Sequence, residues 1–183
     1  MNLRRTLLST VAAAAALAAV APAAWAADNY PSRPIKLIVP FGAGGSTDIV
    51  ARLLADKMGP ILGQAVVIEN KGGAGGAIGA AEIAKSAPDG YTIGMATVST
   101  HGANPAIVSK LPYDAKKDFA PITNVMAVPS VFVVHPSVPA KTMQEFIALA
   151  KKEPGKYSFA SPGTGSLGHA NIENFMNLAG IDL

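Results

Sequence analysis

The sequence predicts an α/β fold with a parallel central sheet, and three observations support this prediction. Residues 35–39 form a short β-prone run, and the glycine-rich residues 41–45 follow it directly. From there the apolar residues change to helical spacing over 46–62. The same succession of strand, loop and helix recurs over 66–86, before a third β-prone run at 92–96. Alternation of this kind is typical of a parallel sheet with helices packed against it.

The first predicted helix has recognisable ends. Ser46 or Thr47 is the expected N-cap, Asp48 lies in the first turn, and Gly63 follows the last turn. The side chains expected on its buried face are apolar and fall near one stripe of the helix. They are Ile49, Leu53, Leu54, Met58 and Ile61.

The second half of the chain carries further local signals. Thr142 and Glu145 stand at the spacing of a capping box, in which both side chains satisfy free amides at a helix start. After the third strand we expect a polar loop over 97–102 and strands over 122–128, 131–135 and 157–160. A helix is expected from Thr142 to about Lys152. A last helix, which ends at Gly180, carries these apolar residues on one face: Ile172, Phe175, Met176 and Ala179.

The first 26 residues have the features of a secretory signal peptide. Arg4 and Arg5 precede an apolar stretch from Leu7 to Val20, and small residues surround Trp25. The apolar stretch is shorter than the roughly 18 to 20 residues that span a bilayer. We therefore expect export and cleavage near Ala26. The arginine pair leaves the route open between the general secretory and the twin-arginine pathways.

The composition of the predicted mature chain argues against several classes of function. Without Arg4 and Arg5, 13 basic residues stand against 12 acidic ones, and the densest basic run, 110–117, is interrupted by Asp114. A nucleic-acid surface needs clustered lysine and arginine, so no nucleic-acid partner is expected. The chain contains no cysteine, which removes disulfides, thiolate metal sites and cysteine nucleophiles.

Two loops share a design that is suited to binding an anion. Residues 41–48 and 161–169 each follow a predicted strand, are rich in glycine and hydroxyl side chains, and open a predicted helix. Glycine lets a ligand approach the backbone closely, and a helix start presents unpaired N–H groups with a partial positive charge. The arginines of the predicted mature chain are Arg33 and Arg52, and Arg52 lies inside a helix, so an arginine is not expected to hold the anion. A tight strand-to-helix turn is the structural alternative for either loop.

Backbone amides, hydroxyl groups and two histidines are the expected ligand contacts. His101 and His169 follow candidate loops, so their ring nitrogens are included. The predicted set is Phe41, Ala43, Gly44, Gly45, Ser46 and Thr47 in the first loop, Ser99 and His101 after the third strand, and Ser161, Thr164, Gly165, Ser166 and His169 in the second loop.

The enzyme motifs in the chain are incomplete. Residues 163–168 match the dinucleotide fingerprint GxGxxG, but Asp182 directly follows the helix stop and leaves no room for the second strand that the fingerprint requires. No GK[ST] sequence occurs, and the hydrolase pattern GxSxG around Ser166 lacks its first glycine. The three histidines stand in no metal-binding spacing. Catalytic residues, a metal and a cofactor are therefore not expected.

Short motifs follow one another from Tyr30 to the last residue. They include Tyr30-Pro31-Ser32-Arg33-Pro34-Ile35, Val39-Pro40-Phe41 with Gly44-Gly45-Ser46-Thr47-Asp48, Gly73-Ala74-Gly75-Gly76, Ala87-Pro88-Asp89-Gly90-Tyr91-Thr92, Leu111-Pro112-Tyr113-Asp114, and Gly163 with Gly165-Ser166. In this order the chain resembles the Bug family of extracytoplasmic solute receptors, the binding components of tripartite tricarboxylate transporters. Gly72 departs from the family pattern, in which proline is common at this position.

The resemblance implies a type II periplasmic-binding-protein-like fold with two lobes, each built on a mostly parallel sheet, that close on a ligand. Family members are longer than this chain, so it implies lobe 1 over 27–124 and an incomplete lobe 2 over 125–183. It also implies a periplasmic receptor that holds a small carboxylate between the loops 41–47 and 161–166, one from each lobe, and delivers it to membrane transporter subunits. A ligand-sensing role with a sensor kinase and an exported enzyme remain the alternatives.

Overall fold

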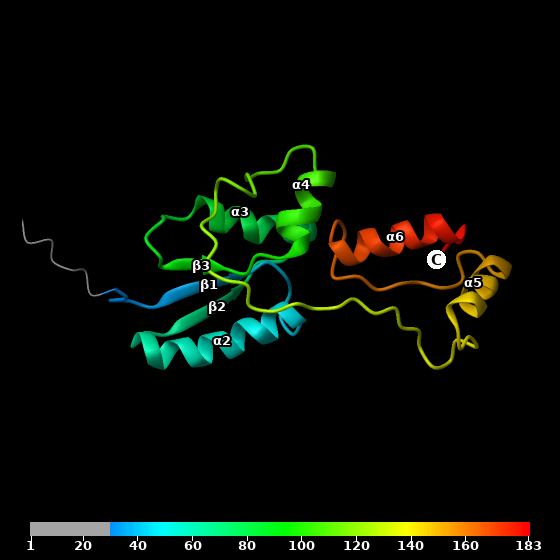
Figure 1. The fold of residues 1–183 in the computed structure, drawn as a ribbon, viewed down its shortest axis with the longest axis horizontal. Helices are drawn as coiled ribbons and strands as arrows, with labels where there is room; N and C mark the ends of the chain where they lie inside the picture. Colours follow the sequence, from blue (N-terminus) through cyan, green and yellow to red (C-terminus); the bar gives the residue numbers. More distant parts are fainter. Residues whose placement is uncertain (1–29) are drawn as a thin grey trace, which may run out of the picture. The chain divides into compact units, whose positions relative to one another are not determined.

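A three-stranded parallel sheet forms the centre of the fold (Figure 1), which the computed structural model describes for residues 30–183. The predicted signal peptide lies outside the described residues, and residues 33–183 form one compact unit. The strands are β1 (Ile35–Val39), β2 (Val66–Asn70) and β3 (Thr92–Gly94), in the order β2-β1-β3. Both strand pairs are parallel, which confirms the predicted sheet.

Two helices cover opposite faces of this sheet (Figure 1). Helix α2 (Ser46–Leu62) connects β1 to β2, and helix α3 (Ala77–Lys85) connects β2 to β3 after a short 3-10 turn, η1 (Ala74–Gly76). Parallel crossovers are right-handed, and β2 and β3 flank β1 on opposite sides. The two crossovers run in opposite directions, so their helices pack on opposite faces.

The core lies on both sides of β1. The apolar side chains of this strand are at most 3% exposed, as expected for a central parallel strand. On one face Leu37 and Val39 pack with Ala51 of α2 and with Met95. On the other side of the sheet, α3 contributes to a second cluster, formed by Ala77, Ala80, Ala81 and Tyr113.

The buried face of α2 differs from the predicted one. Ala51 and Ala55 are buried together with Asp48, while Leu54 and Met58 are half-buried. Small alanine side chains let the helix come close to the sheet, and the charge of Asp48 is buried because neighbouring groups compensate it. Three positions that were predicted to be buried are exposed instead: Ile49, Leu53 and Ile61.

The segment after β3 is helical where a polar loop was predicted over 97–102. A π-helical turn, η2 (Ser99–Ala103), leads directly into helix α4 (Asn104–Ile107). The Tyr113 hydroxyl donates to the carbonyl oxygen of Thr100 (2.5 Å) inside this segment. Such side-chain bonds from a distant residue stabilise the wide turn, and no local periodicity signals them.

The two C-terminal helices confirm the predicted ones. Helix α5 (Met143–Lys152) begins after Thr142, whose Oγ1 accepts a hydrogen bond from the Glu145 amide (3.2 Å). The Glu145 carboxylate accepts from the backbone N–H of the residue before Thr142 (2.7 Å), one position earlier than in a capping box. Helix α6 (Leu167–Ala179) ends at a left-handed glycine as predicted. No helix within residues 30–183 is long and apolar enough to cross a membrane.

Three predicted strands, over 122–128, 131–135 and 157–160, are not formed. A strand needs a neighbour to pair its backbone N–H and C=O groups, and within the described residues no strand lies beside these runs. Several of their apolar side chains are therefore exposed to water, among them Ile122 (81% exposed), Val131 (78%) and Val133 (78%).

Candidate functional site

The candidate site lies at the carboxyl edge of the parallel sheet, where three loops leave the strands. These loops cover 40–45 after β1, 71–76 after β2 and 95–98 after β3. In a sheet of order β2-β1-β3, the connections to the flanking strands pass over opposite faces. Ligands of open α/β sheets bind in the crevice that this reversal creates at the carboxyl ends of the strands.

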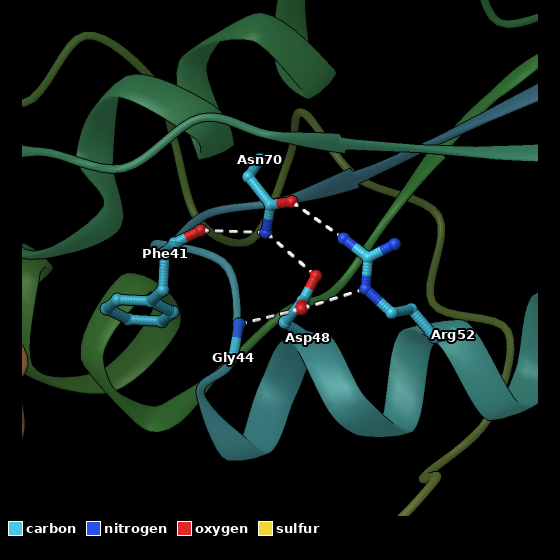
Figure 2. A network of polar contacts seen from close by, with 5 residues as sticks. All are labelled: Phe41, Gly44, Asp48, Arg52 and Asn70. Carbon is cyan, nitrogen blue, oxygen red and sulfur yellow. Dashed lines mark hydrogen bonds and ion pairs between the residues drawn. The ribbon is translucent and has the colours of Figure 1, made fainter.

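A buried carboxylate holds the loop between β1 and α2 (Figure 2). Asp48 is 2% exposed, and its Oδ2 accepts from the Gly44 amide (2.8 Å) and from Arg52 Nε (2.9 Å). Its Oδ1 accepts from Asn70 Nδ2 (2.9 Å), which also donates to the carbonyl oxygen of Phe41 (3.1 Å). The loop is thus tied to both α2 and β2.

The charges of this network compensate one another. Hydrogen bonds from the Arg52 guanidinium, the Gly44 amide and the Asn70 amide hold the pKa of Asp48 far below its ordinary value, so the carboxylate is ionised at neutral pH. Arg52 also donates to Asn70 Oδ1 (3.3 Å). We predicted that no arginine holds the ligand, and this stays a prediction. It is supported by the hydrogen bonds of Arg52, which engage its guanidinium within this network.

The start of α2 keeps its backbone donors available. Gly45 is the N-cap, and no side chain of the described residues caps the helix. The predicted cap, Ser46 or Thr47, is therefore wrong, because the helix already begins at Ser46. Ser46 is exposed and Thr47 is half-buried, and neither hydroxyl is used for capping. The first amides of a helix have no intrahelical acceptor, so an outside anion can satisfy them.

A third loop, which the sequence predicted as a connection between strand and helix without a role in binding, lies against both predicted ligand loops. Residues 73–76 have four positive φ angles in succession, between 49° and 121°. A Cβ atom on Gly76 would lie 3.3 Å from the Phe41 ring, and one on Gly75 would lie 2.5 Å from the Gly165 carbonyl oxygen. At Gly75 and Gly76, left-handed backbone and close contact together require glycine. The run of glycines was the available signal for this loop.

The second predicted loop is tied to η2 and to its own helix. Ser166 is 1% exposed, and its Oγ caps α6 by accepting from the His169 amide (3.3 Å). The Leu167 amide donates to Ser99 Oγ (3.0 Å), and the Gly165 amide makes a long hydrogen bond to His169 Nδ1 (3.5 Å). The structure thus brings four predicted residues together: Ser99, Ser166 and His169 accept hydrogen bonds within the protein, and Gly165 donates one through its amide.

The remaining predicted residues lie at the margins of these loops. The His101 ring packs edge-on against Phe119, with ring centroids 4.5 Å apart, and burial lowers its pKa, so the ring is neutral. Ala43, Ser161 and Thr164 are exposed, and their contact with a ligand stays a prediction. Within residues 30–183 no cluster of acidic and histidine side chains has the arrangement of a metal site.

Comparison with known proteins gives one family. Residues 50–183 match the family described as "Tripartite tricarboxylate transporter family receptor". BugT of Bordetella pertussis is 42% identical over 176 residues, which cover 96% of this chain and 53% of BugT. The chain spans about half the length of the curated relatives that it matches.

Two solved structures of Rhodopseudomonas palustris proteins are similar in fold. Rpa4515 with adipate is 34% identical with a TM-score of 0.78, and MatC with bound malate is 36% identical with a TM-score of 0.77. Each match covers 84% of this chain and 52% of the neighbour. The fold is therefore type II periplasmic-binding-protein-like, with a second lobe that is incomplete in this chain. From both its sequence and its fold, the chain belongs to the tripartite tricarboxylate transporter receptor family.

Proposed function

We propose that the chain is the ligand-binding part of a periplasmic receptor that captures a small carboxylate. The observation that carries this proposal is the uncapped start of α2, where free amides stand beside the hydroxyl groups of Ser46 and Thr47. Such a helix start binds an anion without a cationic side chain. The adipate and malate bound to the two related proteins support a carboxylate as the ligand.

The proposal includes two lobes, 27–124 and 125–183. Their boundary falls in residues 108–142, a stretch without helix or strand. Membrane subunits of a tripartite tricarboxylate transporter receive the ligand from the closed receptor, and the receptor performs no chemistry on it. Among the described residues no observation favours the sensor-kinase role or the exported enzyme over transport.

Isothermal titration tests the proposal. The protein to use is this chain continued after Leu183 by the C-terminal remainder of BugT, here called the extended receptor. Adipate, malate, succinate, citrate and aspartate are titrated in turn, and NMR of the recovered ligand checks that it is unchanged. We expect one binding event per chain, with micromolar or tighter affinity for at least one acid. A chemically altered ligand would indicate an enzyme, and a lack of binding to every acid would contradict the proposal.

Gly45 provides a test of close approach to the backbone. Its φ is −75° and a Cβ there would lie 3.7 Å from the Gly42 carbonyl oxygen, so the loop accommodates a side chain. We expect Gly45→Val in the extended receptor to lower the melting temperature only slightly, since valine is a poorer N-cap than glycine, and to weaken carboxylate binding about a hundredfold, because the side chain covers the amides. Titration and thermal unfolding measure both. Retained affinity in the folded variant would contradict the amide site.

The hydroxyl groups at the start of α2 give a second test. If they donate to the carboxylate, Ser46→Ala and Thr47→Ala should each cost about 1.5 to 3 kcal/mol of binding free energy. The melting temperature should not change, since neither residue caps the helix. Ser166→Ala is the matched control, because its hydroxyl caps α6 and its loss costs about 1 kcal/mol of stability. A fall in stability without a loss of affinity at Ser46 and Thr47 would indicate a structural role.

A further inference from the structure

Asn104 is fully buried at the start of α4, and its neighbours determine how its amide is oriented. Its Nδ2 donates to the Gly75 carbonyl oxygen (3.2 Å) and to the Tyr113 hydroxyl (3.4 Å). Tyr113 gives its own proton to the carbonyl oxygen of Thr100 (2.5 Å), so it accepts from Asn104. Both amide hydrogens are used, and a flipped side chain would place Oδ1 against the Gly75 oxygen. The nitrogen therefore faces Gly75 and Tyr113.

The other end of this amide has no partner. Asn104 Oδ1 is buried without a hydrogen-bond donor in the described part of the chain. A Cβ atom added to Gly75 would lie 3.0 Å from this oxygen and 2.5 Å from the Gly165 carbonyl oxygen. Two hydrogen-bond acceptors therefore lie next to Gly75. A buried acceptor without a donor is unfavourable. A donor from outside the described residues would satisfy this oxygen.

The unpartnered oxygen lies among the loops of the candidate site. Gly75 belongs to the loop that contacts the Phe41 ring through Gly76, and Gly165 belongs to the loop that opens α6. His101, three residues before Asn104, also has a buried ring nitrogen, Nε2, without a partner. One helical segment thus carries two buried polar atoms without a partner in the described part of the chain, and Asn104 Oδ1 is the one that lies beside Gly75.

We propose that Asn104 Oδ1 accepts a hydrogen bond from a hydroxyl or ammonium substituent of the bound carboxylate, so that the receptor prefers hydroxy acids and amino acids to unsubstituted acids. The inference rests on the proposed function. The start of α2 holds the carboxylate, and the substituent reaches the Gly75–Gly165 junction when the loop of Gly165 moves aside. An internal water bound to Oδ1 is the competing explanation, and the experiment separates the two.

Malate and succinate differ by a single hydroxyl group, which makes them a matched pair of probes. Titrated into the extended receptor, malate should bind about tenfold more tightly than succinate. Asn104→Leu keeps the branched shape and the number of side-chain heavy atoms and removes the acceptor. This variant should bind malate no more tightly than succinate, with its affinity for succinate within about threefold of the unaltered value. Aspartate against succinate tests the ammonium group in the same way.

Tyr113→Phe is the control for a merely structural role. It removes the hydroxyl that accepts from Nδ2 and keeps Oδ1, so the melting temperature should fall while the preference for malate remains. Equal affinities for malate and succinate in the unaltered receptor would overturn the inference. The inference is also overturned if Asn104→Leu still binds malate more tightly than succinate, or if this variant loses the same factor of affinity for both acids. Failure of the unaltered receptor to bind any carboxylate is a different result, because it contradicts the proposed function itself.

Discussion

Replacing Asp48 by alanine in the extended receptor is expected to abolish carboxylate binding and to lower the melting temperature by on the order of 10 °C. The carboxylate accepts hydrogen bonds from Gly44, Arg52 and Asn70 at 2.8 to 2.9 Å. Without it the loop over 40–45 loses its tie to α2, and the partly buried Asn70 amide loses an acceptor. Thermal unfolding followed by circular dichroism measures the stability, and titration measures the affinity.

Arg52→Ala is the matched control for this change. Asp48 keeps its bonds to Gly44 and Asn70, and the Arg52 side chain is 52% exposed. The variant should bind within about tenfold of the unaltered receptor and lose less stability than Asp48→Ala. Unchanged affinity in Asp48→Ala would show that the loop does not depend on this network. Lost affinity in a folded Arg52→Ala would instead give the arginine a direct part in binding.

The same prediction has a pH signature. The pKa of Asp48 is lowered in the folded chain by its hydrogen bonds to Arg52, Gly44 and Asn70, whereas in an unfolded chain an aspartate has a pKa of about 3.9. A lowered folded pKa contributes stability above the unfolded value and loses it as the pH falls further. The difference in melting temperature between the unaltered receptor and Asp48→Asn should therefore be constant from about pH 5 to 8 and shrink below about pH 4.

The isolated chain over residues 27–183 is expected to self-associate and to bind carboxylates orders of magnitude more weakly than the extended receptor. Ile122, Val131 and Val133 are 78% to 81% exposed on a segment without strand partners. Helix α6 contains no buried residue. Unpaired backbone beside exposed apolar side chains promotes association between chains. Size-exclusion chromatography with light scattering measures the association, and titration measures the affinity.

Charged substitutions on the exposed segment give the control. Val131→Lys with Val133→Lys should reduce self-association of the isolated chain and leave its far-ultraviolet circular dichroism unchanged, because neither side chain packs in the sheet. Affinity should stay low, since these changes add nothing to the site. A monodisperse, unaltered chain 27–183 that binds malate with micromolar affinity would show that this part alone carries the whole site.

The sequence predicted the parts of the fold that depend on local signals. The strands over 35–39 and 66–69, the helix after Thr142 and the stop at Gly180 were predicted from β-propensity, a capping side chain and a left-handed glycine, and the structure confirms them. Strand formation over 122–135 depends on a neighbouring strand, which a run of valines does not reveal. The buried face of α2 was mistaken because an ion pair places Asp48 inward.

The site was predictable in outline for a similar reason. Glycine-rich loops that open helices are visible in the sequence, and the structure places both at loop-to-helix junctions. The contacts that hold each of these loops against the rest of the fold are not local. Asn70 bonds to Asp48 across 22 positions, and Gly75 meets Gly165 through backbone atoms. No pattern in the chain announces either pair, and the N-cap of α2 proved to be Gly45 rather than a hydroxyl residue.

The junction of Gly75 with Gly165 is formed by two peptide groups with no side chain between them. Side chains at most contacts absorb small displacements by changing rotamer, and peptide groups have no such freedom. The planar peptide groups therefore limit how closely the two loops can approach each other. The loops remain free to separate, because the contact between them is not a bond.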